Sequence, residues 1–146
     1  MSINSRPIEV LLVEDNPGDV HLTRIALADR EVNVNLSVVA DGVEAINFLH
    51  CQGEYHHAVH PDLILLDWNL PRKNGPEVLI EIKADERLQR IPVVVLTTSQ
   101  AEEDILRAYN LHANCYITKP VDFNQFVQIV QSIEDFWFSI VQLPPQ

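Results

Sequence analysis

The stretch VLLVEDN, residues 10–16, places four apolar residues directly before two acids, Glu14 and Asp15. The apolar run shows no alternation of polar and apolar positions, which is typical of a strand buried on both faces of a sheet. Two carboxylates at the tip of such a strand repel each other and lose hydration. We therefore expect either a cation beside them or a loop in which water solvates both.

Length and composition favour one globular domain. The chain has 146 residues, of which 47% are hydrophobic, and this is enough for a core. A formal net charge of −11 argues against a nucleic-acid partner. No apolar run approaches the roughly 18 residues of a membrane span, and the start MSINSRPIEV lacks the apolar segment of a signal peptide. We therefore expect a cytoplasmic protein with no membrane segment.

Short apolar runs alternate with helical patterns along the whole chain. The expected strands are residues 9–13, 36–40, 63–66, 93–96 and 115–117. Cap residues and prolines indicate helix starts at Asn16-Pro17, Asp41, Pro76, Ser99 and Asp122. The pairs Asp41 and Glu44, Ser99 and Glu102, and Asp122 and Gln125 also have the spacing of a capping box. This (βα)5 order predicts an α/β fold, with a doubly wound, five-stranded parallel sheet of flavodoxin-like strand order 2-1-3-4-5.

Polar side chains follow the ends of four of the predicted strands. Strands one and three are neighbours at the switch point of this topology, where ligands bind, so Asp67 should join Glu14 and Asp15. The fourth strand ends at Thr97 and the fifth at Lys119. Three carboxylates and one lysine remain net negative, which suits Mg²⁺, a hard cation with oxygen ligands. The alternative is that each acid merely caps a loop. That alternative would require acids, a threonine and a lysine to follow these strand ends by chance.

The motifs LLVEDN, LILLDWNLP, VVVLTTS and YITKP, in this order, resemble a response regulator receiver domain of the CheY type. The likeness covers about residues 8–141 and implies a single receiver domain over residues 1–146 with short tails. The phrases NPGD, LPRKNG, LTTSQAEEDI and AYNLHANCYITKP further resemble the small stand-alone regulators that partner bacterial phytochrome histidine kinases. The resemblance implies a two-component signalling phosphoprotein that is not itself an enzyme.

The resemblance also implies a role for each matching residue. Asp67 would accept a phosphoryl group from a sensor histidine kinase, and Lys119 and Thr97 would contact the phosphoryl oxygens. Tyr116 would be the aromatic residue whose rotamer follows Thr97 in a conformational switch. The implied Mg²⁺ ligands are Glu14, Asp15, Asp67 and the backbone carbonyl of Asn69.

Other classes fit the same residues less well. A phosphatase of the haloacid-dehalogenase type has a second aspartate two residues after the first, where this chain has Asn69. A flavodoxin has a hydroxyl-rich phosphate loop, whereas EDNPGD would repel an anion unless a cation were present. A degenerate receiver would bind partners without phosphorylation, and the retention of Asp67, Thr97 and Lys119 argues against it.

Two further features, Trp68 and a group of three histidines, could have functional roles, but we favour structural interpretations of both. Trp68, directly after Asp67, could be a lid over the pocket, but large aromatic residues mostly serve packing. His56, His57 and His60 could bind a metal, but a metal site needs rigidly placed ligands. A solvated loop before the third strand is the simpler interpretation of EYHHAVH.

The C-terminal stretch IEDFWFSIVQL predicts a symmetric homodimer. Trp137 belongs to one helical face that can cover the sheet, whereas Phe136 and Phe138 point elsewhere, so the helix is apolar over more than one stripe. Such a patch is rarely exposed without a use. The alternative is that the tail folds back over its own core. Because no output domain follows, we expect the protein to act through protein contacts.

Overall fold

The computed structural model describes residues 7–28, 33–97, 115–119, 122 and 124–128. Its five parallel strands pair in the order β2-β1-β3-β4-β5, which confirms the predicted order. Every observed strand overlaps its predicted residues. The strands are β1 (Ile8–Val13), β2 (Val34–Val39), β3 (Leu63–Asp67), β4 (Val93–Thr97) and β5 (Cys115–Thr118).

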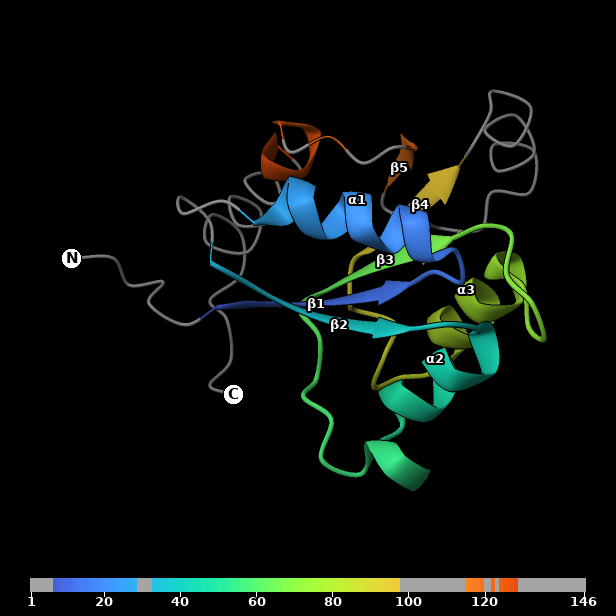
Figure 1. The fold of residues 1–146 in the computed structure, drawn as a ribbon. Coiled ribbons are helices and arrows are strands. Elements are labelled where there is room, and N and C mark those ends of the chain that lie inside the picture. Colours follow the sequence, from blue (N-terminus) through green and yellow to red (C-terminus); the bar gives the residue numbers. More distant parts are fainter. Residues whose placement is uncertain (1–6, 29–32, 98–114, 120–121, 123, 129–146) are drawn as a thin grey trace.

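Helices cover both faces of this sheet (Figure 1). On one face lies α1 (Pro17–Leu27), together with a helical segment at residues 124–128. On the other face lie α2 (Gly42–Leu49) and α3 (Gly75–Ala84), and a short 3₁₀ helix, η1 (Gly53–Tyr55), follows α2. The arrangement is the doubly wound fold that the alternation of elements predicted.

The core has two parts, one on each side of the sheet. All five residues of β3 are buried, as expected for a central strand covered on both faces. Toward α2 and α3, the sheet packs against Phe48, Leu79 and Trp68. Trp68 is 5% exposed, which supports the packing interpretation over the lid. Toward α1, the sheet packs against Leu27 and the fully buried Phe126.

The helix starts follow the cap signals with two corrections. Asn16 and Asp41 cap α1 and α2 through their side chains, as predicted. At Asp41 only one half of the capping box forms, the bond from Glu44 N–H to the Asp41 side chain, and the Glu44 carboxylate accepts a hydrogen bond from Tyr55 Oη at 2.6 Å. Helix α3 begins one residue before Pro76, with a full capping box whose residues are Asn74 and Glu77.

Some expectations concern residues outside the described ranges. These are the helix start at Ser99 and the dimer residues Phe136, Trp137 and Phe138. In the part of the chain that the structure describes, no helix is both long and apolar enough to span a membrane.

Candidate functional site

The site lies at the edge of the sheet toward which the strand arrows point in Figure 1. Glu14 and Asp15 follow β1, and Asp67 is the last residue of β3. Since β1 pairs with β3 in parallel register, with Val13 opposite Leu66, these acids emerge side by side. Each contributes a carboxylate oxygen to a group whose members all lie within 4.8 Å of one another. The structure therefore brings together the three acids that the sequence singled out.

Lys119 reaches the same group from the end of β5. Its Nζ lies 2.7 Å from Glu14 Oε1, 3.0 Å from Asp19 Oδ2 and 3.3 Å from Asp67 Oδ1. Burial of the side chain disfavours its charge, but the hydrogen bonds that the ammonium donates to these acids, together with their negative charges, outweigh burial and raise the pKa of the ammonium. Lys119 is therefore a permanent cation within the acidic pocket.

Asp67 is buried in this pocket, and its acidity is strongly perturbed. Its residue is only 3% exposed. Burial, followed by the charge of Glu14, raises the pKa of Asp67 to about 7, and Lys119 offsets only part of this effect. One lysine thus does not neutralise the carboxylates around it.

The donor set fits a divalent cation. Glu14 Oε1 is buried at ion-pair distance from Lys119 Nζ, but without a well-directed hydrogen bond. Asp15, beside it, is exposed, whereas Asp67 is buried. A cation bound by this group would therefore have protein ligands on one side and solvent on the other. Oxygen ligands from few carboxylates, with room for water, suit Mg²⁺. Glu14, Asp15 and Asp67 are the residues of this structure that could hold it.

The turn after β3 approaches Asp67 closely. The Gly75 N–H donates a hydrogen bond to Trp68 O at 3.1 Å, and a Cβ at Gly75 would lie 2.7 Å from Asp67 O. Only glycine allows this approach. Within the turn, the Asn69 N–H donates to Asp67 Oδ1 at 3.4 Å. The chain thus folds back tightly enough to keep Asn69 beside the acid.

The remaining predicted site residues lie on β4 and β5. Thr97 is the last residue of β4 and pairs with Thr118 of β5, so its backbone is at the same edge as Asp67. Tyr116 lies on β5, is partly buried, and packs against the core on the side of α2 and α3.

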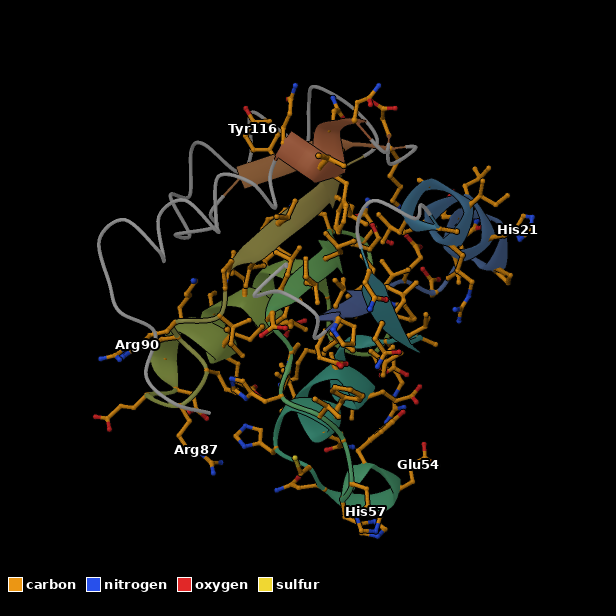
Figure 2. The ribbon with its side chains drawn as sticks, turned by 90° about the vertical axis from the view of Figure 1, so that its left-hand side faces the viewer. His21, Glu54, His57, Arg87, Arg90 and Tyr116 are labelled. Carbon is orange, nitrogen blue, oxygen red and sulfur yellow. The ribbon has the colours of Figure 1, made fainter. Side chains whose placement is uncertain are left out.

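The histidine-rich loop precedes β3, and Asp67 lies at the other end of that strand. Figure 2 shows His57 and Glu54 at the opposite end of the molecule from Tyr116, pointing outward. His56, His57 and His60 are all exposed, in agreement with a solvated loop. Within the described residues, the candidate metal group consists of acids and includes no histidine.

Sequence reasoning missed one charged residue of the site, Asp19. It lies in the first turn of α1, and its carboxylate accepts a hydrogen bond from Lys119 Nζ. The available signal was the phrase NPGD, because a helix that starts immediately after β1 must begin at the same edge of the sheet. That phrase indicated a helix cap, but it did not identify Lys119 as the residue that contacts Asp19.

Fold and site together define a class of protein, a doubly wound α/β domain with an acidic pocket at the switch point of its sheet. The family model described as response regulator receiver domain matches residues 10–131. The chain therefore belongs to the family of response regulator receiver domains.

Particular relatives are response regulators, and one of them is described as a phytochrome response regulator. The chain is 48% identical over 145 residues to Response regulator Rcp1 of Synechocystis sp., and the match covers 99% of both chains. The solved structure of the phosphorylated cyanobacterial phytochrome response regulator RcpA is 52% identical, covers 96% of this chain and 100% of its own, and has a TM-score of 0.74.

Two further solved structures show the same likeness. The bacteriophytochrome response regulator AtBRR is 40% identical, with a TM-score of 0.82, and the match covers 97% of this chain and 99% of that chain. The Mn²⁺-bound form of Rcp1 is 47% identical, with a TM-score of 0.72, and the match covers 95% of this chain and 100% of that chain.

Proposed function

We propose that this chain is a two-component response regulator that accepts a phosphoryl group from a sensor histidine kinase onto Asp67, with Mg²⁺ as cofactor. The observation that carries the proposal is the pocket at the end of β1 and β3. There the buried carboxylate of Asp67 lies in one group with Glu14 and Asp15, and Lys119 Nζ is 3.3 Å from Asp67 Oδ1. Phosphoryl transfer needs mainly positioning and positive charge around the phosphoryl oxygens.

Each residue of the pocket has a separate task in this reaction. A carboxylate oxygen of Asp67 forms the new bond to phosphorus while the bond from phosphorus to the kinase's histidine nitrogen breaks. Lys119 pairs with the phosphoryl oxygens as their negative charge arrives at Asp67. The proposed Mg²⁺ ligands are Glu14, Asp15, Asp67 and the backbone carbonyl of Asn69. When bound, the ion supplies additional positive charge to the phosphoryl oxygens.

The Mn²⁺-bound structure of Rcp1 supports a divalent metal here, since it concerns a relative of 47% identity. Mg²⁺ is the specific choice because the oxygen donors are few and leave positions for water and for phosphoryl oxygens.

The output would be a conformational switch followed by protein contact. Thr97, at the end of β4, would hydrogen-bond a phosphoryl oxygen, and Tyr116 on β5 would change rotamer with it. A ligand shifts such an equilibrium only by contacting the two states differently. The end of β4 at the same edge as Asp67 supports this role for Thr97.

We infer a phytochrome-type kinase as the phosphodonor. The inference comes from the phytochrome named in the description of RcpA, at 52% identity, and of AtBRR, at 40% identity.

A homodimer through Phe136, Trp137 and Phe138 is part of the same proposal. Light scattering on the wild type and on Phe136→Ala/Phe138→Ala tests it, and a monomeric mass for the wild type at high micromolar concentration would refute it.

Intact-mass spectrometry after incubation with a small phosphodonor tests the phosphoacceptor. We expect one phosphoryl adduct when Mg²⁺ is present and none after chelation. Asp67→Asn should abolish the adduct. Asp62→Asn is the matched control, because Asp62 precedes the opposite end of the same strand and its carboxylate accepts a hydrogen bond from Glu9 N. Labelling that persists in Asp67→Asn would contradict the assignment, and no labelling of the wild type would favour a degenerate receiver.

Phosphotransfer from purified kinases tests the partner. A radiolabelled phytochrome-type kinase should transfer its label to the wild type faster than a sensor kinase of another class does. Equal rates from both kinases would remove the support for a phytochrome partner while leaving Asp67 as the acceptor.

A further inference from the structure

Lys119 is shared among three acids, and one of them lies outside the candidate metal group. Glu14 and Asp67 belong to the group that could hold a metal, whereas Asp19 does not. The Asp19 carboxylate accepts a hydrogen bond from Lys119 Nζ at 3.0 Å, which is shorter than the 3.3 Å between Nζ and Asp67 Oδ1. In this structure the ammonium is therefore nearer to Asp19 than to the proposed phosphoacceptor.

The start of α1 fixes Asp19 in this place. Asn16 adopts an extended backbone and its side chain accepts a hydrogen bond from the Asp19 N–H at 3.0 Å. Pro17 at the start of the helix has a backbone angle suited to that position. The carboxylate of Asp19 is therefore held at the sheet edge by its own helix, independently of any metal.

We propose that Asp19 is a positioning residue that competes with the phosphoryl oxygens for the ammonium of Lys119. This inference rests on the proposed function of Asp67. Metal binding at Glu14 and Asp67 would weaken the hold of those two acids on the ammonium, but it would leave the hydrogen bond to Asp19 intact. Lys119 must loosen that bond before it can pair fully with a phosphoryl group.

The direction of the effect follows from this competition. Removing the charge of Asp19 frees the ammonium, so a phosphoryl group or its mimic should bind more tightly. The Asp19 side chain is 32% exposed, and water therefore screens the pair. We expect a gain of about five-fold in affinity, the factor that corresponds to roughly 1 kcal/mol.

Calorimetric titration of the full chain with beryllofluoride and Mg²⁺ tests the proposal. Asp19→Asn should bind about five-fold more tightly than the wild type, and Asp19→Glu, which restores a carboxylate, should return toward the wild-type affinity. Glu77→Gln is the matched control. Glu77 is also an acid in the first turn of a helix, but its carboxylate accepts a hydrogen bond from the Asn74 N–H.

A double-mutant cycle separates competition for Lys119 from direct repulsion between Asp19 and the anion. The affinity gain of Asp19→Asn should disappear in a Lys119→Met background, where fluorine NMR can measure weak binding. A gain that persists without Lys119 would overturn the proposal in favour of repulsion. An unchanged or lower affinity of Asp19→Asn, with normal wild-type binding, would also overturn it. If the wild type itself does not bind beryllofluoride, the proposed function fails and this inference fails with it.

Discussion

Substitution of Gly42 by alanine tests how tightly the start of α2 packs against the loop that follows Asp67. An ideal Cβ at Gly42 would lie 1.9 Å from Lys73 O and 2.7 Å from the Lys73 carbonyl carbon, and real Cβ atoms essentially never come within 3.0 Å of other atoms. The obstructing atoms belong to the backbone, so no side-chain rotation can relieve the clash. One of the two segments must move by about an ångström.

The magnitude follows from two opposing effects. Overpacking of a tight contact costs about 1–3 kcal/mol, and the required movement also disturbs the ion pair between Asp41 Oδ2 and Arg72 Nη1, whose residues adjoin the clash. Alanine is better than glycine in a helix by up to about 1 kcal/mol. We expect the free energy of unfolding to fall by about 2 kcal/mol in total, which corresponds to roughly 4–8 °C in melting temperature for a chain of this size.

Urea unfolding followed by circular dichroism measures this change. The midpoint should fall while the denaturant slope stays constant. Gly18→Ala is the control, because a Cβ there would meet a side-chain atom, Asn16 Oδ1, at 3.1 Å. We expect that variant to stay within about 0.5 kcal/mol of the wild type. Equal effects of the two substitutions, or a neutral Gly42→Ala, would refute the steric reasoning.

Three further predictions concern charge and packing. Burial raises the pKa of Asp41, but the cap bond from Glu44 N–H, together with the hydrogen bond and charge of Arg72, outweighs burial and lowers the pKa below its ordinary value. Above about pH 4, the free energy of unfolding of the wild type should therefore exceed that of Asp41→Asn by about 1 kcal/mol. Urea titrations should show that this difference disappears as the pH falls through the lowered pKa of Asp41 in the folded state. Phe126→Ala should cost about 3–5 kcal/mol in thermal unfolding, and a small loss would contradict its burial. Because the pKa of Asp67 is raised to about 7, Asp67→Asn should stabilise the metal-free protein at pH 8 by about 2 kcal/mol. An equal gain with saturating Mg²⁺ would contradict this reasoning.

The sheet and the meeting of three acids could be predicted from the sequence for a simple reason. Parallel strands joined by helices all end at one edge, so residues that follow apolar runs are brought together without any knowledge of side-chain contacts. Glu14 and Asp67 needed only their positions in the strand pattern and the strand order. Short-range cap signals, such as Asn16, were equally readable because the bond spans three residues.

Contacts between distant segments could not be predicted in this way. The capping box expected between Asp41 and Glu44 formed only in part, because Tyr55, in a later turn, donates a hydrogen bond to the Glu44 carboxylate. A local pattern specifies which bonds are possible, and the tertiary neighbour decides which of them forms.

The sequence by itself determined the strand order, the polar residues at the strand ends and the excess of acid over base among them. Only the tertiary structure decided that Lys119 donates a hydrogen bond to Asp19, 100 positions away, and that Gly42 meets the backbone of Lys73. It also decided the raised pKa of Asp67, which depends on burial and on the distance to Glu14. The physical reason is that charge interactions and steric contact vary over a few ångströms, and separations of that size between distant segments are set by packing of the whole chain.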